Sequence, residues 1–327
     1  MYHQITIIMY HYVRDAHLTK YPNINGILVG EFESQLKYLK KYYSFIKIDD
    51  CIQNLQNGKC LPSNACLLTF DDGYIDHYET VFPILFENDI QGCFFPPAKA
   101  IINHSVLDVN KIHFILASTQ NDLEQLINDI YLMLDEYRSE YKLKLNNFYY
   151  KKLAKANRFD SKEVIFIKRL LQLELDEVLR NIITDKLFKK YVTEDMQSFS
   201  DELYMNLDQL KIMSQSGMYI GSHGYNHYWL DKLSPEKQEY EINQSIDFLS
   251  LVGTPIKNWV MCFPYGAYNR SLIKILKEKN CGLAFTTKYD IASLSKKNAY
   301  TLERLDTNDF PKSEVNYPNK WTQKIIN

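Results

Sequence analysis

Short apolar segments of strand length alternate with longer segments of helical periodicity over most of this chain, and no other feature limits its possible folds so strongly. Residues 65–70 form an apolar run, residues 78–88 have helical spacing, and residues 92–95 form a second apolar run that two prolines close. Such alternation is typical of a parallel sheet covered by helices, because each helix carries the chain back to start a parallel strand. The number of repeats favours closure into a (β/α) barrel.

The other predicted elements follow the same criteria of length and spacing. The predicted strands are residues 5–10, 45–48, 65–70, 92–95, 218–220, 259–263, 282–286 and 300–302. The predicted helices around them are residues 32–43, 78–88, 207–214, 235–251 and 271–279.

The middle of the chain departs from this alternation. Residues 107–202 contain long stretches of helical periodicity, such as LEQLINDIYLMLDEY, with no glycine or proline. This segment is too long and too apolar to be a loop. We therefore expect an α/β fold with a barrel built from residues 1–106 and 203–327, and an inserted helical subdomain, residues 107–202, that forms a cap or a substrate wall.

The composition excludes some classes of partner. The 327 residues carry 38 basic and 40 acidic side chains, a formal net charge of −2, without a Lys/Arg block. This balance gives no sign of a nucleic-acid partner or of a membrane surface held by charge. No apolar run approaches the roughly 18 to 20 residues of a membrane-spanning helix. Since no signal peptide is visible at the N-terminus either, we expect a cytoplasmic protein without an integral membrane segment.

Two neighbouring acids follow the predicted strand 65–70. The sequence LLTFDDGY places Asp71 and Asp72 where a buried strand ends, and a glycine follows them. At the carboxyl end of a barrel strand, one carboxylate could bind a metal ion while the other acts as a base. The pair could equally form an Asp-Asp-Gly turn that caps the next helix.

A pair of histidines follows the predicted strand 218–220. His223 and His227 are four residues apart, a spacing that allows both imidazoles to reach one cation on one face of a helical turn. Taken alone, the pair is more often structural or merely exposed than a ligand pair. A third strand, 259–263, leads into Pro264-Tyr265-Gly266, which by itself predicts only a turn.

Taken together, the three features resemble the polysaccharide deacetylases, the NodB-like carbohydrate esterases of family four. That family has T-F-D-D-G, then H-x-x-x-H, then a P-Y-G segment, in this order and each after a strand. The resemblance extends from about residue 9 to about residue 306, apart from the helical insertion. It implies a distorted barrel with fewer than eight strand–helix units, and one divalent metal ion, usually Zn²⁺.

The resemblance also implies a role for each matching residue. Asp71 corresponds to the general base, and Asp72, His223 and His227 correspond to the metal ligands. The backbone N–H of Tyr265 corresponds to the donor that holds the oxyanion. Three protein ligands would leave positions for water and substrate, as a catalytic metal site requires.

The sequence departs from the family pattern at two positions. Cys262 stands where the family usually has an arginine that orients the base, and no histidine after His227 can supply the usual general acid. Arg304, at the end of a late strand, could replace the missing arginine or could form an ordinary salt bridge. His113 and His11 are the candidates for the acid, with a slight preference for His113 because the insertion could bring it over the site; each could also be an ordinary half-buried histidine. Without a histidine, the leaving amine would take its proton from Asp71 or from water.

These residues predict a metal-dependent hydrolase that removes an N-acyl group, most simply N-acetyl, from a saccharide or activated sugar during surface-polysaccharide biosynthesis. The alternatives are an O-acyl esterase, a deformylase, and a non-catalytic metal-containing sugar-binding protein. A glycosidase is excluded because its two carboxyl groups flank the scissile bond, roughly 5 to 9.5 Å apart. Neighbouring residues such as Asp71 and Asp72 cannot bracket a sugar in that way.

Overall fold

The computed structural model describes residues 3–313, 315 and 317–326. The chain divides into two compact units. The first contains the residues up to Asp15, Gly26–Ser105 and the residues from Asp201 onward, and the second contains Ala16–Asn25 and Val106–Ser200. The second unit thus includes a short N-terminal segment that the sequence pattern gave no reason to separate from the barrel.

The first unit holds all the described strands and has an α/β fold. Its longest strands are β1 (His3–Tyr10) and β3 (Ala65–Asp71), which pair in parallel. The other strands are β2 (Ser44–Phe45), β4 (Gly92–Phe95), β5 (Tyr219–Ile220), β6 (Trp259–Cys262), β7 (Cys281–Phe285), β8 (Ala292–Leu294) and β9 (Leu305–Asp306).

The parallel strands form a ring, and the extent of hydrogen bonding between neighbouring strands varies around it. Continuous ladders join β1 to β3, β3 to β4 and β4 to β5, and a separate ladder joins β6 to β7. On one side, the N–H of Ser222 donates to the Val260 carbonyl at 3.0 Å and the N–H of Cys262 donates back to Ser222 at 2.8 Å. On the other side, the N–H of Leu302 donates to Ala284 at 3.1 Å, and β9 pairs with β1. The first unit is therefore a distorted barrel.

Side chains along each strand alternate between the inside and the outside of this ring. Leu67 of β3 lies in the inner core with Cys93, Val260 and Leu283 from neighbouring strands. Its neighbour Phe70 packs on the outside, stacked between the rings of Tyr10 and Phe94. The antiparallel strand β8 extends the sheet at the amino end of β1, where Ala292 pairs with Ile5. Residues of odd number in β3 thus face inward, and this parity includes Asp71.

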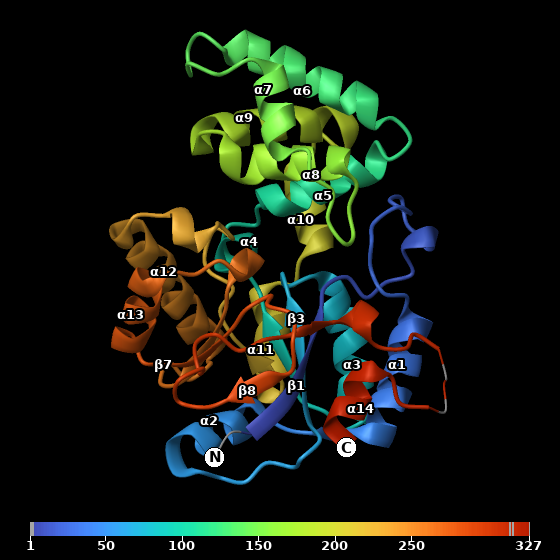
Figure 1. Cartoon of the computed structure of the whole chain (residues 1–327), viewed down its shortest axis with the longest axis vertical. Helices are drawn as coiled ribbons and strands as arrows, with labels where there is room; N and C mark the ends of the chain where they lie inside the picture. Colours follow the sequence, from blue (N-terminus) through green and yellow to red (C-terminus); the bar gives the residue numbers. More distant parts are fainter. Residues whose placement is uncertain (1–2, 314, 316, 327) are drawn as a thin grey trace. The chain divides into compact units, whose positions relative to one another are not determined.

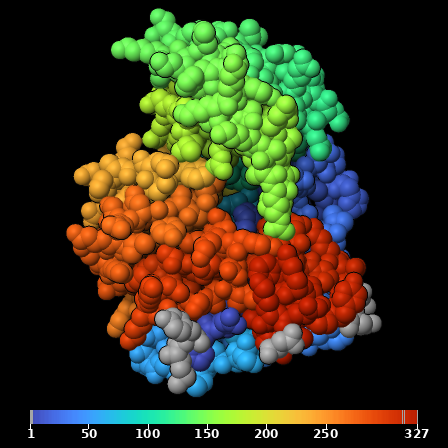
Figure 2. All heavy atoms as spheres, in the orientation of Figure 1, coloured from blue at the N-terminus to red at the C-terminus, as the bar shows by residue number. Residues whose placement is uncertain are grey.

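Helices cover the outside of the barrel (Figure 1). In that view α12 and α13 lie together on one side of β1 and β3, and α1, α3 and α14 lie on the other. Figure 2 shows the face of the first unit on which the C-terminal residues, in orange and red, form much of the surface. The helices of this unit are α1 (Val29–Tyr42), α2 (Ile48–Asn57), α3 (Phe82–Glu87), α4 (Ala98–Ile102), α11 (Leu207–Gln215), α12 (Pro235–Val252), α13 (Arg270–Glu278) and α14 (Lys320–Ile326).

The second unit is helical and has its own aromatic core. The Phe199 ring contacts the rings of Phe114 and Phe188, and Tyr21 from the N-terminal segment packs on Phe114 and Phe199. Helix α10 (Met196–Leu203) begins in this unit and ends in the first. The other helices are α5 (Asp108–Ser118), α6 (Leu123–Tyr137), α7 (Asn146–Leu153), α8 (Lys162–Arg169) and α9 (Glu177–Tyr191).

Two predicted strands differ from the structure, and some short elements were not predicted. The predicted strand 45–48 is shorter, because Ile48 already begins α2, a helix that we did not predict. The predicted strand 300–302 is a turn in which only Leu302 bridges to β7, and the three-residue β8 was missed. Among the described residues, no helix combines the length and apolar content needed to cross a bilayer.

The three tryptophans all belong to the first unit. Trp259 opens β6 and is fully buried, Trp321 is buried in α14, and Trp229 lies just before the short helical turn η4 (Leu230–Lys232).

Candidate metal centre

Asp71 ends β3 as an inward-facing side chain at the carboxyl edge of the barrel. It is 2% exposed, and the Arg304 guanidinium binds both of its oxygens, at 2.8 Å to Oδ1 and 2.7 Å to Oδ2. The Cys262 thiol also points at the carboxylate, with Sγ 3.4 Å from Oδ1. Burial raises the pKa of Asp71, but the adjacent Arg304 charge outweighs burial and holds that pKa well below its usual range.

Arg304 reaches this position from the turn just before β9. Its side chain is fully buried and also donates to the carbonyl of Thr286 and the hydroxyl of Thr69. The ion pair with Asp71 is not at the surface, because the guanidinium is fully buried. The planar fork of arginine suits two-point binding of a carboxylate and fixes its orientation.

Asp72 adopts a left-handed backbone conformation, with φ of 76°. Its side chain therefore does not follow the inward–outward alternation of β3. Gly73 follows at φ 71°, and a Cβ there would lie 2.5 Å from the Pro96 Cβ, so this turn requires glycine. The Tyr74 hydroxyl donates to Asp72 Oδ2 at 2.6 Å. Asp72 Oδ1 is buried and accepts no hydrogen bond from the described residues.

Both histidines direct a ring nitrogen at this oxygen. Nε2 of His223 lies 3.4 Å from Asp72 Oδ1, and Nε2 of His227 lies 3.3 Å from it. Nδ1 of His223 lies 2.8 Å from the Cys262 carbonyl, which fixes Nδ1 as the protonated nitrogen and leaves the Nε2 lone pair for a ligand. Burial lowers the pKa of His227, which favours the neutral imidazole that metals bind.

The donor set fits a divalent cation. The ligand atoms of Asp72, His223 and His227 lie within 4.8 Å of one another, and all three residues are buried. One carboxylate and two imidazoles form a usual zinc set with an open coordination position. A second group, Asp71, His223 and Cys262, has similar spacing. It suits a cation less well, because Arg304 already occupies both oxygens of Asp71.

The loop that carries the two histidines is held from both sides. The Glu241 carboxylate of α12 accepts the N–H groups of Tyr225 and Asn226, each at 2.9 Å, and the Asn226 amide at 2.6 Å. Opposite it, the first N–H groups of α4 donate to the carbonyls of Gly224 and Tyr225 at 3.1 Å. Nothing in the local sequence singled out Glu241, because it lies 14 residues beyond His227 in a polar helix.

Comparison with known proteins identifies the family. The model of the polysaccharide deacetylase family matches residues 58–284, a span that contains the acid pair, both histidines and the Pro-Tyr-Gly segment. The chain belongs to the polysaccharide deacetylase family.

Individual relatives of this deacetylase family agree with the assignment. The Bacillus subtilis protein YxkH, which carries the name of a polysaccharide deacetylase, is 30% identical over 101 residues, or 30% of this chain. That match spans about a third of YxkH (33%). The Streptococcus pyogenes deacetylase PplD in complex with acetate has a TM-score of 0.57 at 18% identity, covering 94% of this chain and 93% of PplD. IcaB from Ammonifex degensii has a TM-score of 0.55 at 18% identity, covering 99% and 96%. At these identities the structures support the fold.

Tyr265 lies beside His227, one of the candidate metal ligands, and has an unusual backbone conformation. It lies in the short turn η5 (Pro264–Gly266) with φ of 57°, in the left-handed region. Its ring stacks on Trp229 at 4.5 Å between centroids and meets the His227 ring edge-on at 4.8 Å. These contacts hold the Tyr265 ring between Trp229 and the candidate ligand His227.

The two candidate acids differ in their surroundings. His11 directly follows β1, and its Nε2 lies 4.0 Å from Asp71 Oδ2 with the side chain 39% exposed. His113 is half-buried in α5 of the second unit. The structure therefore brings His11 to the acid pair, while the hypothesis about His113 stays a prediction.

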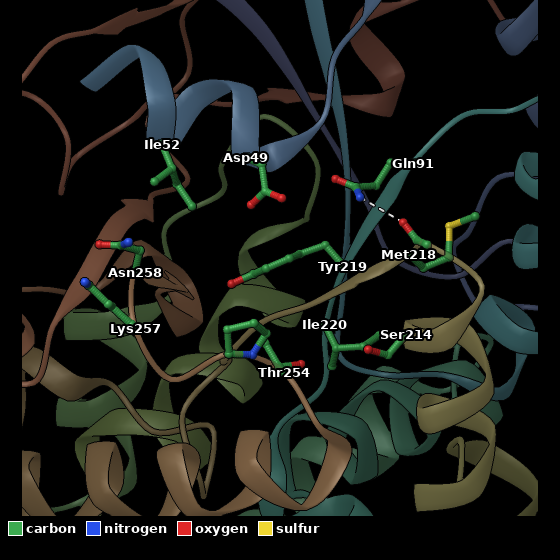
Figure 3. A pocket seen from close by; sticks show the side chains of 12 residues that line it. Asp49, Ile52, Gln91, Ser214, Met218, Tyr219, Ile220, Thr254, Lys257 and Asn258 are labelled. Carbon is green, nitrogen blue, oxygen red and sulfur yellow. Dashed lines mark hydrogen bonds between the residues drawn. The ribbon is translucent and has the colours of Figure 1, made fainter. Parts of the chain in front are cut away.

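A cavity of about 280 Å³ lies at the other end of the barrel strands (Figure 3). It is lined at the amino ends of β4, β5 and β6, and two of its polar side chains bind neighbouring backbone groups. Gln91 donates to the Gly217 carbonyl at 2.8 Å, shown dashed in Figure 3, and accepts the N–H of Ile48 at 2.9 Å. Tyr219 accepts the N–H of Val260 at 2.9 Å. Because this end of such barrels carries stability and the carboxyl end carries chemistry, we assign the cavity to the scaffold.

Proposed function

We propose that this chain is a metal-dependent hydrolase that removes an N-acyl group, most simply N-acetyl, from a saccharide or activated sugar in surface-polysaccharide biosynthesis. The proposal rests on two neighbouring carboxylates that have different partners. The first is buried and held by an arginine, and the second faces two histidines. Their different partners suit Asp71 to the role of base and Asp72 to the role of metal ligand. A sugar-binding protein without turnover has no use for the base.

Asp72, His223 and His227 would hold one divalent cation, which we propose to be Zn²⁺. A cation there would polarise the acyl oxygen and lower the pKa of a bound water. Burial lowers the pKa of His223, but Cys262 and Asp72 raise it by more than burial lowers it. Because a cation competes with that proton, we expect the metal to bind less tightly as pH falls.

Asp71 would accept the proton of the attacking water. The Arg304 contact keeps its carboxylate ionised at neutral pH, which is the form that accepts a proton. Arg304 also fixes the direction of the carboxylate and thereby performs the orienting task expected of the arginine that Cys262 replaces. As the acyl carbon becomes tetrahedral, the backbone N–H of Tyr265 would donate to the developing oxyanion.

The leaving amine needs a proton, and we propose His11 as its donor. Its imidazole lies at the acid pair and is partly exposed, so a substrate could reach it. His113 remains the second candidate. Relatives support the amide as the bond that is hydrolysed: one structure of similar fold is described as a de-N-acetylase of Aggregatibacter actinomycetemcomitans, with a TM-score of 0.54 at 16% identity, covering 98% of this chain and 99% of that one.

The test is release of acyl acid from N-acetylated oligosaccharides and nucleotide-sugars, with and without added Zn²⁺. We expect Asp71→Asn to keep its metal and to lose roughly 10²-fold or more in rate, because an amide has the same shape but accepts no proton. His223→Ala and His227→Ala should lose the metal itself. Normal turnover by Asp71→Asn would remove the base, and full metal content in both histidine variants after dialysis would place the cation elsewhere.

The same assay separates the remaining alternatives. Faster release from O-acetylated or N-formylated sugars would identify an esterase or a deformylase. Sugar binding without release from any substrate would identify a non-catalytic relative. His11→Ala should abolish the alkaline limb of the pH–rate profile while keeping the metal, and the same result with His113→Ala alone would assign the proton donor to the second unit.

A further inference from the structure

One segment of the second unit concentrates positive charge that the balance of the whole chain conceals. The basic segment, residues 142–162, contains seven Lys and Arg side chains and one acid, Asp160, a net charge of +6 within a chain of net charge −2. Its basic residues are Lys142, Lys144, Lys151, Lys152, Lys155, Arg158 and Lys162.

Most of this charge is free of internal partners. Within the part of the chain that the structure describes, Lys152 pairs with Glu174 at 2.6 Å. The remaining lysines around α7 are exposed and form no ion pair with a described residue: Lys142, Lys144, Lys151 and Lys155. A cluster of unpaired like charges repels itself, and an anionic surface would relieve that repulsion.

The same segment exposes large apolar side chains. Leu145 is 72% exposed, Phe148 is 49% exposed and Phe159 is 62% exposed. Helix α7, labelled in Figure 1, turns a different aromatic pair inward: Tyr149 is buried, and Tyr150 packs on Phe166 of α8. Leu145 and Phe148 are therefore exposed although other aromatic side chains of this segment pack inward.

Within α7, three of the exposed residues lie on one face. At 100° per residue, Lys151 falls about 60° to one side of Phe148 and Lys152 about 40° to the other, and Leu145 directly precedes the helix. Phe148 thus has a lysine on either side of it on this outer face. Long lysine stems can extend sideways so that the ammonium groups meet headgroups while the apolar residues enter the layer below.

We propose that the second unit docks on an anionic membrane surface through the basic segment, with Leu145 and Phe148 entering the headgroup region. Lysines near an anionic bilayer are each attracted to it, and buried apolar side chains add affinity. A soluble polyanion would satisfy the lysines but would leave Leu145 and Phe148 in water. The combination therefore favours a bilayer. This inference is independent of the hydrolase chemistry and concerns where the protein meets its substrate.

The experiment is co-sedimentation of the full chain with vesicles. One set contains phosphatidylcholine and phosphatidylglycerol in a roughly 7:3 ratio, and the other contains phosphatidylcholine alone. We expect binding to the anionic set only, weakened about tenfold or more by high salt. Leu145→Ser/Phe148→Ser and Lys151→Glu/Lys155→Glu should each weaken binding about tenfold or more, with far-UV circular dichroism and deacylation of a soluble sugar unchanged.

Matched control variants test whether position matters. Leu132→Ser removes an equally exposed leucine, 67% exposed, from α6 of the same unit, where the neighbours include Asp135 and Glu136. Lys296→Glu/Lys297→Glu reverses two exposed charges in the first unit. Both controls should bind as the unmodified chain does. Absence of vesicle binding, equal loss in the controls, or heparin binding that matches vesicle binding and ignores the Leu145→Ser/Phe148→Ser change would overturn the proposal.

Discussion

The buried ion pair of Asp71 and Arg304 links the acid pair to a part of the chain more than 200 residues away. From the sequence, Arg304 was only a possible substitute for the arginine that the family usually has at position 262. The structure is consistent with that hypothesis: the guanidinium reaches Asp71 from the residues before β9, and the Cys262 thiol contacts the same carboxylate. A single sequence gives no sign of such an exchange, because the two positions share no local pattern.

Another buried histidine, His77, leads to a prediction about stability and pH. Burial lowers the pKa of His77 to about 4, while Nε2 is hydrogen-bonded at 2.8 Å to the His11 carbonyl. The unfolded chain takes up this proton near pH 6.5, and the folded chain does so only near pH 4. Folding stability from this group is thus complete above about pH 6.5 and is lost as pH falls toward 4.

Urea unfolding of the protein and of His77→Gln at about pH 7.5 and about pH 5 measures this effect, in chelator so that metal loss does not contribute. The glutamine amide can still donate to the His11 carbonyl but does not titrate. We expect the unmodified protein to lose about 2 kcal/mol more than the variant between these pH values. Equal losses would show that His77 does not titrate as inferred.

At the scale of elements, the histidine loop is held by helix α12. Glu241 of α12 binds two backbone N–H groups and one side-chain amide of the loop that ends in His227. We expect Glu241→Ala to lower metal affinity roughly 10- to 100-fold, as is typical when a group that orients metal ligands is lost. Competition with a chromogenic zinc chelator measures this affinity.

Glu241→Gln is the matched control for that prediction. Its amide oxygen can still accept the two backbone N–H groups, so metal affinity should stay within a few-fold of the unmodified protein. Unchanged metal affinity in Glu241→Ala would show that α4 alone holds the loop.

Sequence patterns located the long elements better than the short ones. Helix α12 and strand β4 match their predictions, because length, spacing and flanking proline or glycine agree there. The two-residue strands β2 and β9 and the three-residue β8 were misplaced or missed. Segments so short contain no complete hydrophobic period, and their conformation is set by the strands beside them. Asp71, Asp72, His223 and His227 could be named as candidates because they follow strands that the pattern could locate, and their roles stay predictions.

At the scale of the whole molecule, the division into two units means that metal binding acts on one unit directly. The proposed ligands Asp72, His223 and His227 all belong to the first unit. A ligand that binds the folded state alone raises stability by about 2.7 kcal/mol at a concentration of 100 times its Kd. The second unit should receive this stabilisation only if the two units unfold together.

Because all three tryptophans belong to the first unit, intrinsic fluorescence can show whether the two units unfold together. Trp229, stacked on Tyr265 beside His227, reports at the metal centre itself. We expect Zn²⁺ to move the unfolding transition seen by tryptophan emission to higher urea, while part of the far-UV ellipticity, from the helices of the second unit, is lost at an unchanged urea concentration. Coincident curves at every metal concentration would instead show one cooperative unit. The tryptophans thus report on the unfolding of the unit that contains the proposed metal ligands.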